Sequence, residues 1–192
     1  MKTNLLIAIL TFTMASFSYA DSTITKKEFH KKFQGVWETT EFLNGAWVKL
    51  EWIVKKKRAR HLVTAYADPE LTIPILKWDI TRRYKLKKPS RLFAQAYNLT
   101  WKDKRANIEI FIDNPELFAQ LGIDDCNLKV GEPRDLSIDN CAAPPFPFRT
   151  CKMKDFVELK DNYQIMTFGD PTQKDRCQER PTRYEDWSFT RL

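Results

Sequence analysis

Histidine is the side chain that most often transfers protons near neutral pH, and this sequence of 192 residues contains two. His30 lies in a lysine-rich segment, and His61 follows a basic run from Lys55 to Arg60. Neither has a cysteine, serine or carboxylate at a spacing typical of a nucleophilic site or a metal centre. We therefore interpret both histidines as ordinary surface or packing residues.

Carboxylates could also do chemistry, and the adjacent pairs Asp124-Asp125 and Glu185-Asp186 are the clearest examples. Adjacent acidic residues in a loop usually have no chemical role and only keep the loop exposed to water. The sequence contains no phosphate-binding, dinucleotide-binding, serine-hydrolase or zinc-protease motif. It therefore predicts neither an enzyme nor a cofactor, and catalysis by carboxylates alone stays open as the alternative.

All four cysteines lie in the last third of the chain, at Cys126, Cys141, Cys151 and Cys177. An even number in an exported chain predicts two disulfides, with three ways of pairing them. We expect pairing in sequence order, Cys126 with Cys141 and Cys151 with Cys177. The alternative, a zinc site, needs close pairs such as C-x-x-C, whereas the spacings here are 15, 10 and 26. No metal is predicted.

The first twenty residues resemble a cleavable export signal. Lys2 precedes a short apolar run from Leu5 to Phe12, and Ser18-Tyr19-Ala20 offers small residues where a signal peptidase cleaves. The run is too short to cross a bilayer, although an uncleaved anchor helix is the alternative. We expect a signal peptide at 1–20 and one domain at 21–192, located in the periplasm or secreted.

The strongest local structural signal is Asn44-Gly45, which predicts a tight hairpin between strands at 36–43 and 46–54. In the second of these strands Leu50 and Trp52 belong to an apolar face that alternates with a mixed face, as in a sheet that buries one side. Further strands are predicted at 60–67, 75–86, 92–101, 107–112, 127–130, 135–138, 156–159, 163–168 and 187–190.

Two short helices complete the predicted elements. Residues 22–33 form a helical lead-in, with Phe29 and Phe33 one turn apart. Residues 114–122 have Asn114 as the N-cap, Pro115 in the first turn and Gly122 at the end. Many short strands with six Trp, six Tyr and thirteen Phe favour a mainly all-β fold, an antiparallel barrel or sandwich.

The net charge is +7, and two runs concentrate it, from Lys55 to Arg60 and from Arg82 to Lys88. Such runs can bind polyanions. Because we expect export, lipid head groups, lipopolysaccharide or polysaccharide fit better than nucleic acid. The alternative is that the runs are solvated loops and outward strand faces. The oligomeric state is not indicated.

Two patterns carry a family resemblance. Gly35-Val36-Trp37 in the first strand, with Arg191 in the last, is similar to the lipocalin and calycin arrangement, in which a Trp closes one barrel end beneath a late basic residue. The other pattern resembles the domain family named for the secreted Wnt inhibitor "adenomatosis polyposis coli down-regulated 1". Its motifs occur here in one order: Tyr66-Ala67-Asp68-Pro69, Cys126 with Cys141, Phe168-Gly169-Asp170 and Arg180-Pro181-Thr182-Arg183-Tyr184.

The chain departs from that family at two cysteines. The family has one cysteine shortly after the first Trp and another just past the D-P, where this chain has residues 39–41 and Leu71. Both are missing together, which leaves no orphan thiol and indicates the loss of a whole bridge. Cys151 and Cys177 would be an additional pair. The first hairpin is therefore expected to be less rigid than in the family.

The resemblance implies a lipocalin-like antiparallel barrel or half-barrel of bacterial type that takes an acyl chain or another apolar ligand. The predicted lining residues are Leu50, Trp52, Trp78, Phe93 and Tyr97, and the basic runs are predicted to hold an anionic head group at the mouth. Two main functions stay open: an exported binding module for a lipid-like ligand, and a structural or protein-interaction domain whose own side chains fill the core.

Overall fold

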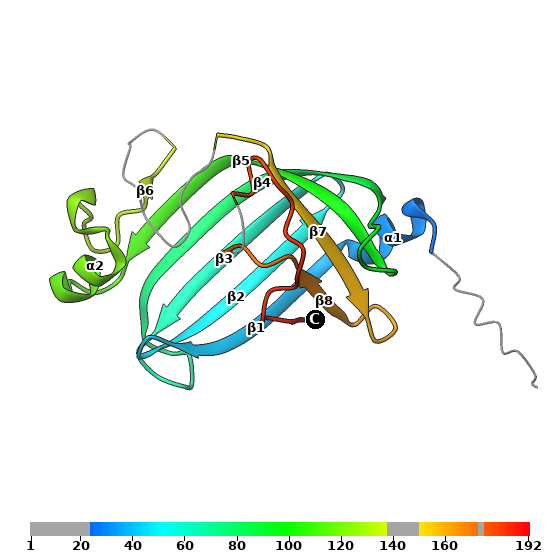
Figure 1. The fold of residues 1–192 in the computed structure, drawn as a ribbon. Coiled ribbons are helices and arrows are strands. Elements are labelled where there is room, and N and C mark those ends of the chain that lie inside the picture. The colour runs from blue at the N-terminus through cyan, green and yellow to red at the C-terminus, as the bar shows by residue number, and fades with distance from the viewer. Residues whose placement is uncertain (1–23, 138–149, 173–174) are drawn as a thin grey trace, which may run out of the picture.

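The computed structural model describes residues 24–137, 150–172 and 175–192, so the predicted signal peptide lies outside the described residues. Within them, nine strands form one antiparallel sheet that closes on itself (Figure 1). Following the ring, the order is β1-β2-β3-β4-β5-β7-β8-β9, and β9 returns to pair with β1. The small strand β6 pairs with β5 at the rim. The predicted mainly all-β, lipocalin-like barrel with short helices is confirmed.

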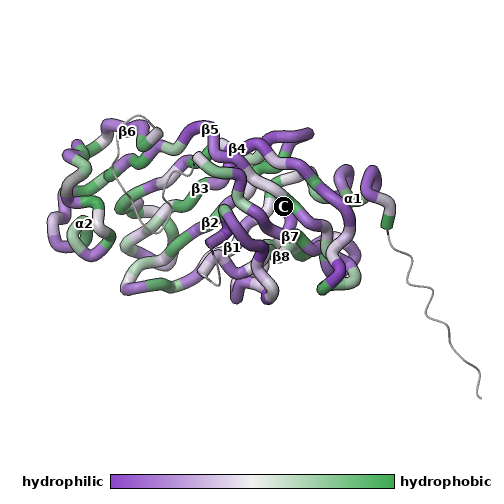
Figure 2. The backbone as a smooth tube through the Cα atoms, turned by 45° about the horizontal axis from the view of Figure 1, so that its top comes forward, coloured by the Kyte–Doolittle hydropathy of each residue, from purple (hydrophilic) through white to green (hydrophobic). Residues whose placement is uncertain are grey.

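The strands have these bounds: β1 Gly35–Leu43, β2 Ala46–Lys55, β3 Arg58–Tyr66, β4 Pro74–Pro89, β5 Ala96–Ile110, β6 Arg134–Asp135, β7 Met153–Lys160, β8 Ile165–Phe168 and β9 Phe189–Arg191. The helices are α1 Lys26–Phe33, α2 Pro115–Leu121 and the short 3₁₀ turn η1 Asp124–Cys126. Hydrophobic and hydrophilic residues alternate along the barrel strands, because successive side chains point into and out of the ring (Figure 2). Among the described residues, no helix combines the length and apolarity needed to span a bilayer.

The predicted Asn44-Gly45 hairpin is confirmed. Both residues have positive φ, 50° and 83°, which is the geometry that lets a two-residue turn follow the twist of the strands. The turn sets the register of β1 and β2, in which Leu43 pairs with Ala46 and Trp37 pairs with Trp52. The inward face of β2 is thereby fixed.

β5 differs from the sequence-based prediction. Strands were predicted at 92–101 and 107–112, but the structure has one continuous strand from Ala96 to Ile110. The polar stretch between them contains a β-bulge, because Arg82 pairs with Asp103 whereas the preceding Thr81 pairs with Arg105. Asp103 points inward and is buried. The bulge and this buried charge interrupt the alternation of apolar and polar residues, so the sequence does not reveal one continuous strand.

The strand predicted at 127–130 does not form as such. Asn127 and Gly131 have positive φ and break the extended backbone on either side. Val130 makes a single parallel bridge to Ile110 instead. The predicted strands at 135–138, 163–168 and 187–190 correspond to the shorter β6, β8 and β9, and Ile138 lies outside the described residues.

The two helices lie at opposite ends of the barrel (Figure 1). α1 begins at the N-cap Thr25, and its Phe29 and Phe33 are fully buried. Phe29 packs on Tyr97 and Phe33 on Tyr84, with ring centroids 4.5 and 5.2 Å apart. This end of the barrel is therefore filled with side chains. α2 has Asn114 as N-cap and Gly122 as left-handed C-cap, as predicted.

The Trp37 side chain lies beside α1 and has no exposed surface. Its Nε1 donates to the Phe33 carbonyl oxygen at 3.1 Å, which ties β1 to the helix. The guanidinium of Arg191, the register partner of Trp37, lies 5.1 Å from the centroid of the indole. Gly35 has φ 146°, and a Cβ there would be 3.2 Å from Nη2 of Arg191. The backbone angle thus favours glycine, and a larger residue would also require the Arg191 side chain to shift.

One predicted disulfide, Cys151–Cys177, is confirmed, with Cα atoms 5.8 Å apart. It joins the start of β7 to the segment before β9. Cys126 is buried at the end of η1, whereas Cys141 lies outside the described residues. The pairing of Cys126 with Cys141 therefore stays a prediction.

Peptide mapping of the protein, purified without reduction, is expected to find Cys126 joined to Cys141 and Cys151 joined to Cys177. Each bridge closes a loop in the unfolded chain, so reducing one should lower the free energy of unfolding by roughly 3 kcal/mol. A peptide that joins Cys126 to Cys151 or Cys177, or a free thiol at any cysteine, contradicts this pairing.

Candidate functional site

The barrel encloses a cavity of about 360 Å³, on the side away from α1. This volume lies within the range of roughly 300–1,000 Å³ that is typical of small-molecule sites. The strand register arranges its wall in layers. Val48, Ala65 and Leu76 form one layer, and the next consists of Leu50, Val63 and Trp78. Leu117 and Leu121 of α2 contribute apolar surface as well.

The layer closer to α1 is more polar, and its first members are Trp52 and His61. Their rings are stacked, with centroids 4.1 Å apart and planes 7° apart. His61 is 5% exposed, and burial is the main cause that lowers its pKa well below the usual range, with Arg82 and Arg176 adding to it. His61 is therefore a neutral packing residue of the cavity wall at physiological pH.

Arg82 brings a positive charge to the cavity wall from β4. Its Nε donates to Asp103 Oδ1 at 2.8 Å, and the Asp103 side chain is fully buried. The guanidinium also lies 5.2 Å from the centroid of the Trp52 ring. Burial lowers the pKa of Arg82, and Asp103 opposes that shift. An arginine keeps its proton under such conditions, so Arg82 and Asp103 form a buried ion pair.

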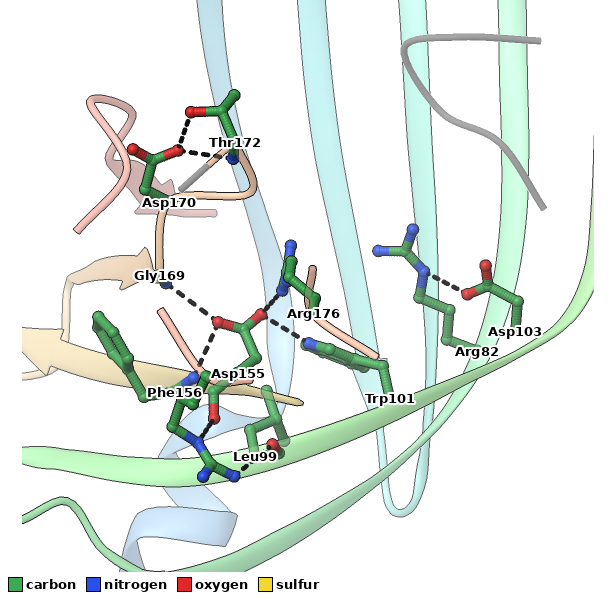
Figure 3. A network of polar contacts seen from close by, with 11 residues as sticks. Arg82, Leu99, Trp101, Asp103, Asp155, Phe156, Gly169, Asp170, Thr172 and Arg176 are labelled. Atoms are coloured by element: carbon green, nitrogen blue, oxygen red, sulfur yellow. Dashed lines mark hydrogen bonds and ion pairs between the residues drawn. The ribbon is translucent and has the colours of Figure 1, made fainter. Parts of the chain in front are cut away.

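Asp155, on β7, is the centre of a second polar network (Figure 3). Its Oδ1 accepts from the backbone N–H groups of Phe156 and Gly169, at 2.8 and 3.1 Å. Its Oδ2 accepts from Trp101 Nε1 at 2.9 Å and from the guanidinium of Arg176. Burial is the largest cause and raises the pKa of Asp155 above its usual range, although Arg176 and the three N–H donors oppose this shift. Because all four partners donate, they hold the carboxylate in its ionised form.

Glu185 is the remaining acidic residue of the cavity wall. Its neighbour Asp186 is exposed, as predicted for a loop acid, but the prediction of a solvated Glu185 is wrong because its side chain turns inward. Burial, reinforced by Asp155, raises the pKa of Glu185 to about 8. The Oε1 atom of Glu185, Nε of Arg176 and Nε1 of Trp52 are closed to solvent and have no hydrogen-bond partner among the described residues.

Two of the motifs that carry the family resemblance, Phe168-Gly169-Asp170 and Arg180-Pro181-Thr182-Arg183-Tyr184, meet around Asp155. A Cβ on Gly169 would be 2.8 Å from Cβ of Pro181, so these two motifs are in direct contact. Arg183 Nε donates to Asp170 Oδ2 at 2.6 Å, and Arg180 Nε donates to the Asp155 carbonyl oxygen at 2.6 Å. These contacts hold the chain between β8 and β9 across the barrel, where it contributes Glu185 and Trp187 to the cavity.

Three of the five predicted lining residues, Leu50, Trp52 and Trp78, line the cavity. Tyr97 is not a lining residue: it is buried under α1 and donates from its hydroxyl to the Ile24 carbonyl oxygen at 2.7 Å. Phe93 is not a lining residue either. It precedes β5, in the connection from β4, and its ring packs on Phe156 and Tyr184 outside the cavity. Alternation of apolar and polar residues identifies inward side chains within strands, but it gives no information about the loop between β4 and β5.

The sequence-based prediction missed the polar residues of the lining, which are Arg82, Asp155, Arg176 and Glu185. Arg82 belonged to a basic run that was interpreted as an outward face. Arg176 and Glu185 lie outside the strands, where no periodic signal exists. The arginines could have been found only by asking which charges face the buried Asp103 and Asp155, and that requires the register.

The two basic runs come together on the outside of the barrel. Arg58 pairs with Arg83, and Arg83 pairs with Lys102, so three exposed cations lie side by side on neighbouring strands. This stripe begins at the turn before β3, beside α1, at the opposite end from the Asn44 turn that borders the cavity. Contact with an anionic surface stays a prediction, but the stripe is not placed to hold a head group at the mouth.

Among the described residues, no group of three His, Cys, Asp or Glu side chains is arranged to hold a metal ion. No protein-family model matches the chain, and a search of curated proteins finds no match. The resemblance to the family of the Wnt inhibitor "adenomatosis polyposis coli down-regulated 1" therefore stays a prediction, and function has to be argued from the barrel itself.

Proposed function

We propose that this chain is an exported binding module that takes a lipid-like or other hydrophobic ligand inside its barrel. The observation that supports this most strongly is the cavity of about 360 Å³ with its apolar layers formed by β2, β3 and β4. A core filled by its own side chains would leave no such volume, since protein interiors are packed to the density of organic crystals. The Cys151–Cys177 disulfide fits an oxidising compartment.

The energetics allow this function. Each methylene moved from water into the cavity contributes roughly 0.8 kcal/mol, whereas association costs at least about 4 kcal/mol in lost freedom of motion. A chain of a dozen methylenes therefore contributes about 10 kcal/mol, and the excess of up to about 6 kcal/mol corresponds to a Kd of about 0.1 mM. The filled-core alternative is supported at the α1 end, where Phe29, Phe33 and Trp37 leave no space.

Titration of the exported, oxidised protein with the uncharged apolar fluorophore N-phenylnaphthylamine is expected to give saturable, displaceable binding. Ala65 is a small lining residue that points into the cavity, so Ala65→Phe should occupy the site and weaken binding by roughly tenfold or more. Ala119 is exposed on α2 and does not line the cavity, which makes Ala119→Phe the matched control with unchanged binding.

Circular dichroism and the unfolding midpoint have to show that both variants are folded. Binding that is absent up to the solubility limit of the fluorophore, or equal in the folded Ala65→Phe and Ala119→Phe proteins, would leave the filled-core interaction domain as the better account.

A further inference from the structure

The charges around the cavity are balanced by the protein itself. Arg82 has Asp103 as its partner and Arg176 has Asp155, and both carboxylates are almost completely buried. His61 is neutral because of its burial. We call the end of the cavity that these residues line the polar end. There the positive and negative charges cancel before any ligand binds. A site built for a carboxylate or phosphate would instead present a cation without a buried counter-charge.

Glu185 makes this end of the cavity still less favourable for a negatively charged ligand. It adds a carboxyl group that makes no ion pair of its own within the described part of the chain, because Arg176 is already bonded to Asp155. Burial raises the pKa of Glu185 to about 8. At pH 7 the group is mostly protonated and the polar end is neutral. Above pH 8 the group ionises, and the polar end becomes negative. At neither pH does it have an excess of positive charge.

Three polar atoms at this end lack partners among the described residues: Oε1 of Glu185, Nε of Arg176 and Nε1 of Trp52. The two nitrogens can only donate, whereas the carboxyl group can donate or accept depending on its proton. A hydroxyl group both donates and accepts, so it could satisfy this mixture after a rotation of the Glu185 side chain. Burying a charged head would cost more, because no opposite charge is available to it.

We propose that the cavity selects an uncharged amphiphile, with its hydroxyl-bearing head at the Arg176–Glu185 end and its apolar chain against β2, β3 and β4, and that it discriminates against long-chain carboxylates. This inference rests on the proposed ligand-binding function and specifies the class of ligand. It runs against the anionic head group that the basic runs alone suggested, because those lysines lie on the outside.

The test is a competition series in which N-phenylnaphthylamine is displaced by lauryl alcohol, laurate and laurylamine, which share one chain and differ in head charge. At pH 7 lauryl alcohol is expected to displace the fluorophore at a concentration about tenfold or more below that of laurate or laurylamine, because only the alcohol avoids burying a net charge. Laurate that competes as well as the alcohol or better overturns the proposal. If the fluorophore binds but the competitors do not follow this ranking, the proposed ligand class is wrong while the ligand-binding function stands. If no fluorophore binds, the proposed function itself fails.

The pH dependence provides a second readout that needs no destabilising variant. The charged groups that act on Glu185 are Asp155 and Asp170, which raise its pKa, and Arg176, which lowers it. Between pH 7 and pH 9 the protonated fraction of Glu185 falls, so the cationic laurylamine should bind several-fold more tightly at the higher pH. In Glu185→Gln, which stays neutral and keeps a hydrogen-bonding head, laurylamine affinity should not change. An equal change in the variant and the parent would assign the effect to another group and contradict the role of Glu185.

Discussion

Trp37→Ala is expected to lower the free energy of unfolding by about 3–5 kcal/mol, which is the usual cost of removing a fully buried large aromatic side chain. Trp37 is 0% exposed, and its Nε1 hydrogen bond to Phe33 connects the first strand to the helix that closes this end. The substitution also removes the ring beneath Arg191, which bonds the Lys32 and Gln34 carbonyl oxygens. The first strand, α1 and the last strand would therefore loosen together.

Urea unfolding of the oxidised protein measures this effect, and Trp47→Ala is the matched control. Trp47 lies on the same hairpin but is only half-buried and packs on the exposed Phe42. Its loss should cost clearly less than that of Trp37. Equal losses for the two variants would show that the barrel end is not closed by Trp37.

Asp155→Asn should destabilise by about 3–5 kcal/mol, even though the change is isosteric, because it leaves a buried charge without its partner. Asp155 accepts from four donors, and an amide would place its own NH₂ group against at least one of them. Arg176 would then have no hydrogen-bonded counter-charge among the described lining residues, because its Nε and the Glu185 Oε1 make no hydrogen bond to any described residue.

Asp79→Asn is the comparison for this variant. Asp79 accepts two hydrogen bonds from Arg60, but this pair lies on the outside, where the Arg60 side chain is 48% exposed. Solvent weakens such pairs, so the expected loss is below about 1 kcal/mol. If both Asp variants unfold at the same urea concentration, the buried network does not hold β7 to the segment before β9.

The elements that could be predicted from the sequence are those decided by local chemistry. Asn44-Gly45 has the φ angles that its turn demands, and Asn114 and Gly122 cap α2 with their own atoms. The Cys151–Cys177 pair followed from order along the chain in an oxidising context. The inward positions of Leu50, Trp52 and Trp78 followed from alternation within regular strands.

The charged end of the cavity could not be predicted because long-range pairing creates it. Asp103 faces Arg82 only through the bulge between β4 and β5, and that bulge also merged two predicted strands into one. Arg176 and Glu185 reach the cavity because a chain segment without regular structure crosses the barrel, held through Gly169, Pro181 and Asp170. In a segment without the periodicity of a strand, the sequence does not indicate which side chains face the cavity.

Nuclear magnetic resonance tests most directly whether a ligand lies inside this barrel. With the oxidised protein saturated by lauryl alcohol, nuclear Overhauser effects are predicted from the alcohol's methylenes to the methyl groups of Leu50 and Val63 and to the Trp78 indole, which line the cavity. The exposed Phe42 and Leu92 should show none. Effects confined to such surface residues, or no effect on any residue, would contradict binding inside the barrel.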